Sequence, residues 1–227
     1  MLDPKSFWKQ FQSLIPTFLI IYPPVLLIFG SLALLTWRTR FDPWLLTADP
    51  LAVYRAPIYI GAISNLGILL WCASASICLF CFVLLRKNPV HRLPALFLLF
   101  SGLIISILML DDFFQLHEKI YRDTLNIPEA FVVSVYGVLF LANLIAFRKV
   151  VLETNFLLFL LAFGFFGLSL FFDLIMVQNI HGKNYQEIYE EGAKLMGLVS
   201  WTAYFIRAAL QITRPALVPG PGDNQPG

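Results

Sequence analysis

Residues 95–117, "ALFLLFSGLIISILMLDDFFQLH", form a long apolar run that closes with two adjacent aspartates, Asp111 and Asp112. A helix that crosses a bilayer needs about 20 mostly apolar residues, and this run is long enough. Charged groups are costly in lipid, so ionisable residues inside a membrane span usually mark a function. The stretch therefore indicates a transmembrane helix with a polar feature at one end.

Five further runs of similar character flank this one, at 17–37, 58–85, 130–147, 156–177 and 189–212. The composition agrees, because 59% of the residues are hydrophobic and 13% are charged, against about half and about a quarter in soluble domains. We therefore predict an all-α fold, a multi-pass transmembrane bundle of about six helices over residues 17–212. Its expected surroundings are the lipid bilayer, with a membrane-protein partner or a second copy as open alternatives. The net charge of +2 gives no indication of nucleic-acid binding.

The two ends of the chain differ in character from this bundle. Residues 1–16 are expected to form a short interfacial segment, and residues 213–227, rich in Pro and Gly, a disordered tail. Nine of the 16 Lys and Arg residues fall on the side that holds both ends of the chain. Because cytoplasmic loops carry the excess of positive charge, we expect both termini in the cytoplasm.

Acidic residues gather at the opposite ends of three expected helices. Asp111 lies about 25 Å along its helix from Pro94, and Asp173 stands four residues before the end of the run 156–177. The last run begins with Glu190 and Glu191, and the basic residue Lys194 follows within one turn. If the three helices adjoin, these acids meet at one depth in the membrane.

The resulting charge balance is the basis of a functional hypothesis. Six carboxylates are expected near Lys194, namely those of Asp111, Asp112, Glu118, Asp173, Glu190 and Glu191. Close carboxylates in a medium of low dielectric constant cannot all stay ionised without compensation. The sequence therefore suggests a proton or cation site, with Lys194 as the charge partner. The competing interpretation is a salt-bridged belt at the membrane surface.

Helical geometry limits which of these groups can share one face. At about 100° per residue, Asp111, Gln115 and Glu118 form one polar stripe. Asp112 and His117 point away from that stripe, and His117 joins it only if the helix ends or tightens near Leu116.

A divalent metal is the alternative to protons as the cofactor of such a cluster. Carboxylates and imidazoles are ligands for Mg, Mn, Fe or Zn, and the candidates are His117, Asp111, Glu118, Asp173 and Glu191. No H-x-x-x-H or H-E-x-x-H motif accompanies them. The cysteines of "CLFC" (78–81) lie inside an apolar run, where we expect packing rather than redox or metal chemistry.

Taken together, these residues resemble a group of uncharacterised bacterial six-helix membrane proteins. In that group a helix ends in L-D-E-x-x-x-x-H-E, a later helix carries one acid, and the last helix begins with E-E followed by Met-Gly. The matching residues are Leu110, Asp111, Asp112, His117, Glu118, Asp173, Glu190, Glu191, Met196 and Gly197. Asp112 and Asp173 stand where the pattern has Glu, and Lys194 lies near a usual acid. The resemblance implies that the cluster acts as a unit, and it implies no reaction.

Two functions from different classes remain open on these grounds. The leading hypothesis is a cation- or proton-linked site in a transporter or membrane enzyme. The alternative is a non-catalytic membrane subunit or assembly factor whose acidic cluster is structural. The sequence assigns no catalytic residue and no substrate.

Overall fold

The computed structural model describes residues 59–176 and 183–217 and scattered positions between 12 and 57, without the side chains of 118, 119, 129, 173–176, 183–188, 216 and 217. The chain forms two compact units, Met1–Ile60 and Gly61–Gly227. Most of the expected first span and interfacial segment, and the end of the expected tail, fall outside the described residues. Several of the described positions between 12 and 39 are helical.

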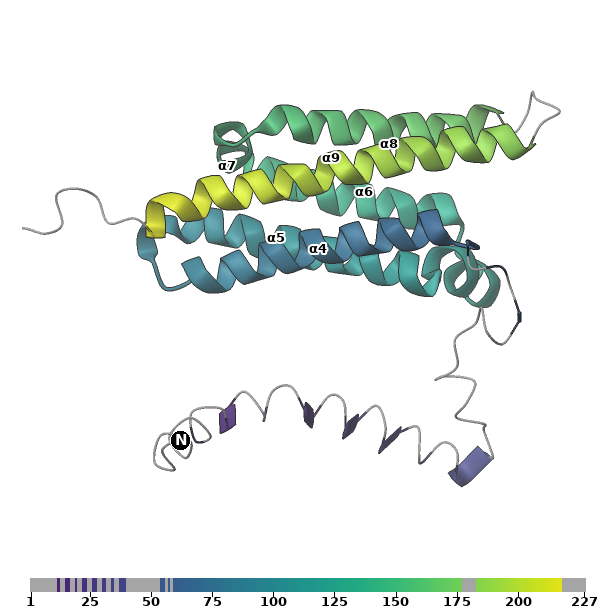
Figure 1. The fold of residues 1–227 in the computed structure, drawn as a ribbon, viewed down its shortest axis with the longest axis horizontal. Helices are drawn as coiled ribbons and strands as arrows, with labels where there is room; N and C mark the ends of the chain where they lie inside the picture. Colours follow the sequence, from purple (N-terminus) through teal and green to yellow (C-terminus); the bar gives the residue numbers. More distant parts are fainter. Residues whose placement is uncertain are drawn as a thin grey trace, which may run out of the picture. The chain divides into compact units, whose positions relative to one another are not determined.

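The second unit is built from helices throughout its described part, which confirms the predicted all-α class. Figure 1 shows the long helices lying alongside one another, with the short helix α7 at one end. The elements are α4 (Ala62–Leu85), η1 (Pro89–His91), α5 (Arg92–Phe114), η2 (Leu116–Thr124), α6 (Glu129–Ala146), α7 (Arg148–Glu153), α8 (Phe156–Met176) and α9 (Lys183–Leu217).

Three of these helical stretches are long and apolar enough to cross a membrane, at Ala62–Leu85, Pro89–Phe114 and Tyr189–Pro215. Two shorter apolar helices, Ala130–Ala146 and Phe156–Phe172, accompany them. Lengths near 20 apolar residues match the hydrocarbon thickness of a bilayer. The helices therefore support a membrane protein, as the apolar runs predicted.

The helices pack in the order of a ring. α4 packs against both α5 and α9, α8 packs against α9, and α6 packs against α5. The ring thus runs α6, α5, α4, α9 and α8, and Phe140 on α6 meets Phe159 and Phe163 on α8, with ring centroids 5.8 and 5.6 Å apart. This order decides where a cavity can form in the bundle.

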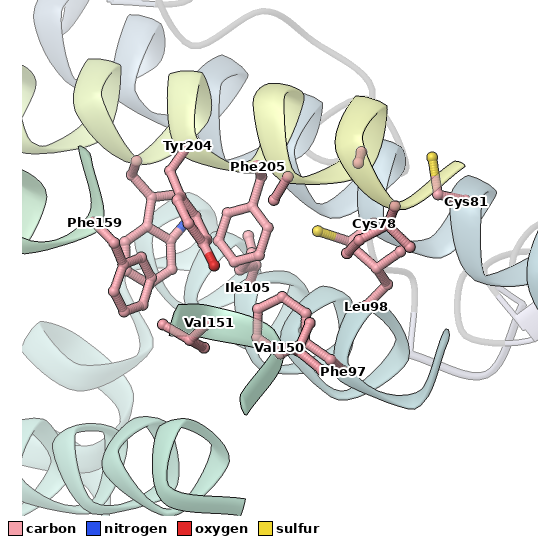
Figure 2. Close-up of a cluster of buried hydrophobic side chains, with 14 of the residues drawn as sticks. Cys78, Cys81, Phe97, Leu98, Ile105, Val150, Val151, Phe159, Tyr204 and Phe205 are labelled. Carbon is pink, nitrogen blue, oxygen red and sulfur yellow. The ribbon is translucent and has the colours of Figure 1, made fainter. Parts of the chain in front are cut away.

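Aromatic and aliphatic side chains fill the centre of the ring (Figure 2). Trp201 is 2% exposed, and its ring lies 5.2 Å from that of Phe159 and 4.6 Å from that of Phe140. Cys78 is fully buried in the same core, and Cys78 and Cys81 are free thiols. The packing role predicted for these two cysteines agrees with their positions.

Hydrogen bonds between helices connect the buried polar residues. Ser74 on α4 donates to Thr202 on α9 at 3.0 Å, and Asn143 on α6 donates to Ser101 on α5 at 3.0 Å. Inside a membrane such groups have no water to bond with, so they pair across helix contacts. These bonds hold α6 and α9 in place around the site described next.

Candidate functional site

α5 ends at Phe114, three residues earlier than the apolar run predicted, because Gln115 adopts the left-handed conformation with φ 50° and ψ 45°. The chain then continues as the π-helical segment η2. The expected continuous stripe of Asp111, Gln115 and Glu118 is therefore wrong. Its premise was an unbroken helix, and a left-handed residue redirects every side chain that follows. The condition stated for His117, a helix end near Leu116, is met instead.

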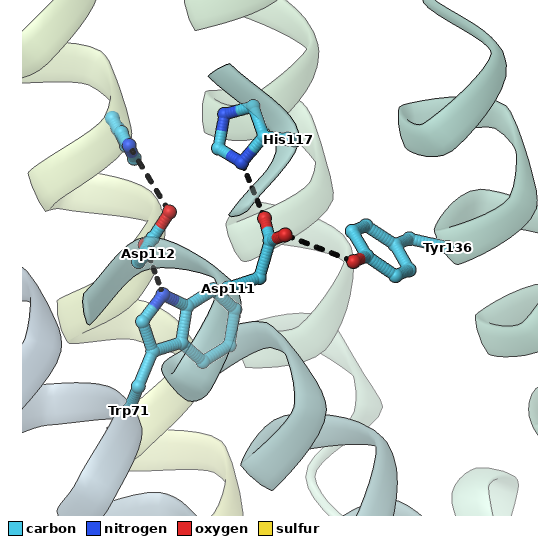
Figure 3. A network of polar contacts seen from close by, with 6 residues as sticks. Trp71, Asp111, Asp112, His117 and Tyr136 are labelled. Atoms are coloured by element: carbon cyan, nitrogen blue, oxygen red, sulfur yellow. Dashed lines mark hydrogen bonds and ion pairs between the residues drawn. The ribbon is translucent and has the colours of Figure 1, made fainter. Parts of the chain in front are cut away.

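The break brings His117 back onto the carboxylate of Asp111. Asp111 is 3% exposed, and one of its oxygens, Oδ2, contacts Nδ1 of His117 directly. The other oxygen, Oδ1, accepts a hydrogen bond from the hydroxyl of Tyr136 on α6 at 3.0 Å. Figure 3 shows both partners converging on this carboxylate. A buried carboxylate is thus satisfied on both oxygens, as burial of a charge requires.

The side chain of Asp112 points about 100° around the helix from that of Asp111. It therefore contacts two other helices, α4 and α9. Its Oδ2 accepts from Nε1 of Trp71 on α4 at 3.0 Å (Figure 3). Its Oδ1 lies 3.8 Å from Nζ of Lys194 on α9. The two adjacent aspartates therefore tie the end of α5 to α4, α6, α9 and η2.

A cavity of about 360 Å³ lies beside this network. This volume falls within the range of about 300–1,000 Å³ that is usual for small-ligand pockets. Five aromatic residues make up much of its apolar wall: Trp71, Phe140, Phe163, Phe166 and Trp201. The polar part of its lining is Asp112, His117, Tyr136, Ser169, Glu190, Glu191 and Lys194. The cavity is amphipathic, with ionisable groups and an aromatic surface in one space.

Negative charge predominates in the lining. Asp112, Glu190 and Glu191 supply three carboxylates, whereas Lys194 supplies one ammonium group. A second cavity of about 10 Å³, lined by residues of α4, α5 and α9, shares Asp112, Glu191 and Lys194 with the larger one. Its volume is about that of a single water molecule. The side chains of Asp112, Glu191 and Lys194 therefore lie between the two cavities.

The end of α8 lies beside the start of α9, and α9 in turn reaches the end of α5. The ring of Phe172 near the end of α8 lies 5.7 Å from that of Tyr189 on α9, next to Asp173 and Glu190 in the chain. Lys194 forms its ion pair with Asp112 on another helix. The side chains of Glu118 and Asp173 lie outside those the structure describes, so their part in the site stays a prediction.

Two of the residues that hold the network were missed by the sequence reasoning. Trp71 and Tyr136 each sit inside an apolar run, where an aromatic residue is an ordinary packing choice. The sequence offers one indication, the hydroxyl of the tyrosine and the indole N–H of the tryptophan, because buried Tyr and Trp usually find a hydrogen-bond partner. Nothing local in the sequence indicates that the partners are Asp112 and Asp111.

Asp111, Asp112 and His117 have the ligand types and spacing to hold a metal ion. Each offers one ligand atom, and these atoms lie within 4.8 Å of one another. Carboxylate oxygen and imidazole nitrogen suit divalent first-row metals. The ammonium group of Lys194 near Asp112 opposes a cation at that carboxylate.

One family model, described as a domain of unknown function (DUF8692), matches residues 20–208 of the chain. No curated protein and no solved structure matches it. The matched range includes Trp71, Asp111, Tyr136 and Lys194. The site therefore lies within the part of the chain that defines the family.

Proposed function

The chain belongs to the family of the domain of unknown function DUF8692, and we propose that it is a multi-pass membrane protein that binds a small ligand inside its helix bundle and exchanges one proton with the solution as the ligand binds. His117 carries the exchanged proton, and Asp111 holds the imidazole in position. The cavity beside them receives the ligand. The site serves as the substrate site of a transporter or membrane enzyme.

One observation carries this proposal: both groups that bond to the buried carboxylate of Asp111 also line the cavity. His117 contacts Oδ2 and Tyr136 donates to Oδ1, and both residues belong to the cavity wall. A carboxylate that engages one ring nitrogen of a histidine orients the imidazole and stabilises its protonated form. A proton taken up from the solution at His117 is therefore compensated inside the bundle by Asp111.

The proposal is tested by measuring protons released or taken up when a ligand binds. Purified full-length protein in weakly buffered nanodiscs, with a pH-indicator dye, is mixed with fractions of a small-molecule extract from cells. Thermal shift identifies the fractions that bind. For these, the wild type should change the pH by up to about one proton per protein, because one imidazole exchanges it.

The comparison variant is His117→Gln, which keeps a polar side chain and cannot carry the proton. We expect this variant to lose the pH change. An exposed residue of η2 provides the control, and Asp123→Asn should behave like the wild type. Binding accompanied by equal proton changes in the wild type and His117→Gln would refute the proposal.

A second candidate, a divalent-cation site at Asp111, Asp112 and His117, is favoured by the mutual distances within 4.8 Å. Elemental analysis of the purified protein tests it. About one metal ion per chain, lost in Asp111→Asn, would support this candidate. Wild-type protein that is free of metal after purification without chelators would refute it.

The structural alternative, a non-catalytic subunit or assembly factor, makes a different prediction for the same variants. If the cluster only fixes helix packing, His117→Gln and Asp111→Asn act through loss of folding or of a co-purifying partner. Thermal unfolding and pull-down of the tagged chain separate this outcome from a lost proton change in a folded protein.

A further inference from the structure

The segment η2 lies between two residues in the left-handed conformation, Gln115 with φ 50° and Asn126 with φ 53°. Left-handed backbone is unfavourable for residues that carry a Cβ, although asparagine tolerates it better than glutamine does. Such residues persist where other contacts hold them in place, and they gather at switch regions. π-helical backbone such as that of η2 is also rare and frequent at functional sites. Both ends of η2 are therefore positions at which a change of direction releases strain.

Two side-chain contacts hold η2 against its neighbours. His117 contacts the buried carboxylate of Asp111 at the end of α5 (Figure 3). Four residues later, Tyr121 interacts through its hydroxyl with that of Tyr136 on α6. These closing contacts join η2 to the two helices against which it packs, α5 and α6, and they oppose the strain at its ends.

η2 also forms part of the wall of the larger cavity. His117 on η2 lines this cavity, and so does Tyr136, which Tyr121 contacts. The part of the cavity next to His117 and Tyr136 is called its polar side below. A movement of η2 that separates the closing contacts therefore removes wall from the polar side of the cavity.

We propose that η2 is a lid on the polar side of the cavity, which opens when Gln115 leaves the left-handed conformation and α5 continues through it. In the open state His117 no longer reaches Asp111, because a continuous helix separates these side chains by about 120° and by about 9 Å along the axis. Opening gives small molecules in solution access to the polar side. The inference rests on the proposed function, because it describes how access to the same ligand site is controlled.

The balance of forces on η2 is the one that a lid requires. A hydrogen bond and a left-handed residue change stability by similar amounts, so the closing contacts are partly offset by the strain at Gln115 and Asn126. A small free-energy difference then separates the closed and open states. Elements that move over ligand sites generally come from the less stable parts of a fold.

Reaction of a cysteine at position 169 with iodoacetamide tests the lid in nanodiscs that contain the full chain. Ser169 on α8 is buried and lines the cavity, and Ser169→Cys only replaces the side-chain oxygen with sulfur. Mass spectrometry of peptides measures the modification at each cysteine separately. When the reagent reacts slowly, the labelling rate follows the population of the open state. Cys78, which is fully buried in the core, reports global unfolding in the same sample.

Gln115→Gly and Gln115→Ala form a matched pair at the hinge. Glycine removes the cost of left-handed backbone and is a poor helix former. Gln115→Gly therefore favours the closed lid and should slow labelling at position 169 about fivefold. Alanine keeps that cost and is the best helix former, so Gln115→Ala should label at least as fast as the chain with Gln115. Equal labelling at position 169 in the two variants, with Cys78 unchanged, would overturn the inference.

Tyr121→Phe tests the second closing contact. It removes the hydroxyl that meets Tyr136 and keeps the ring, so it should raise labelling at position 169 about fivefold, as the loss of one hydrogen bond would. The exposed Tyr59 supplies the control, and Tyr59→Phe should leave labelling unchanged. The same labelling rate in both variants would overturn the role of Tyr121 in the lid.

Amide hydrogen exchange of the chain with Ser169 intact is a second measurement, which applies even if Ser169→Cys prevents folding. Opening of the lid exposes the amides of η2 without exposing those of the core of α4. Gln115→Gly should therefore slow exchange in η2 about fivefold and leave exchange in α4 unchanged. Exchange in η2 that does not respond to Gln115→Gly would overturn the inference.

The outcomes also separate the lid from the proton proposal. Labelling at position 169 that responds to Gln115→Gly, with equal proton changes in the wild type and His117→Gln, would support the lid and refute the proton link. Proton changes that depend on His117, with labelling and exchange that do not respond to Gln115→Gly, would refute the lid alone.

Discussion

Asp111 and His117 are six residues apart in sequence, and their side chains are in direct contact across a break in the helix. In a continuous α-helix, side chains six residues apart point about 120° away from each other and are separated by about 9 Å along the axis. The left-handed Gln115 removes that separation. The contact that orients His117 therefore depends on one backbone conformation.

The conformation of Gln115 can be tested with a glycine. A non-glycine residue pays about 1–2 kcal/mol for the left-handed region, and glycine adopts it freely. Gln115→Gly should raise the free energy of unfolding by about 1 kcal/mol, and Gln115→Val should lower it by a similar amount, because a β-branched residue is more strained there. Thermal unfolding in nanodiscs measures both. Lower stability of Gln115→Gly would show that the exposed glutamine side chain matters.

The hydroxyl of Tyr136 is expected to stabilise the buried carboxylate of Asp111. Tyr136→Phe keeps the ring and removes the donor 3.0 Å from Oδ1, which should lower the free energy of unfolding by about 2 kcal/mol. Tyr59, which is 73% exposed, supplies the control, and Tyr59→Phe should change stability by less than about 0.5 kcal/mol. Chemical or thermal unfolding measures the change in the free energy of unfolding for both variants. Equal changes would contradict a stabilising role for the Tyr136 hydroxyl.

The ion pair between Lys194 and Asp112 should appear as coupling in a double-mutant cycle. Lys194→Met and Asp112→Asn remove the two charges, whose atoms lie 3.8 Å apart. We expect a coupling free energy of about 1 kcal/mol, since both side chains are partly exposed. A cycle of Lys194→Met with Asp123→Asn should give a coupling near zero. Equal coupling in the two cycles would show a general effect of net charge instead.

Close packing at Gly197 should make this position intolerant of any side chain. An added Cβ would lie 2.7 Å from ring carbons of Phe166, and Phe166 is itself stacked on Trp71 at 6.0 Å. Gly197→Ala should therefore destabilise the protein by about 1–3 kcal/mol. On the same helix, nothing lies within 4 Å of a Cβ at Gly192, and Gly192→Ala should stabilise by up to about 1 kcal/mol. Thermal unfolding of the pair gives the sign of each effect.

Much of the fold follows from local sequence, as α4 and α8 illustrate. Their apolar lengths predict helices, and the observed bounds, Ala62–Leu85 and Phe156–Met176, differ from the expected runs by only a few residues. Hydrophobic length depends only on neighbouring residues in the chain, so a single sequence contains it. The predicted end of α5 lies later in the chain than the observed one. The apolar pattern continues through Phe113 and Phe114, and no glycine or proline indicates the break at Gln115.

The site could be predicted as a location but not as a set of contacts. The charges of Asp111, Asp112 and Lys194 within apolar runs predicted that polar groups gather at helix ends, because isolated charges are costly in lipid. Asp111, Asp112 and His117 do lie together in the structure. The partners Trp71 and Tyr136 could not be identified, since each lies on another helix and resembles a packing residue in its own run. The ring-shaped packing order of the helices is likewise absent from any local pattern.

By itself the sequence determined an apolar, helical protein with its ionisable groups concentrated at a few helix ends, because helix length and the cost of buried charge are properties of each segment. Only the tertiary structure decided that His117 turns back onto Asp111, that Lys194 pairs with Asp112, and that His117, Asp112 and Lys194 border an aromatic cavity. The physical reason is that each of these contacts depends on the path of the chain at Gln115 or on side chains from helices far apart in sequence.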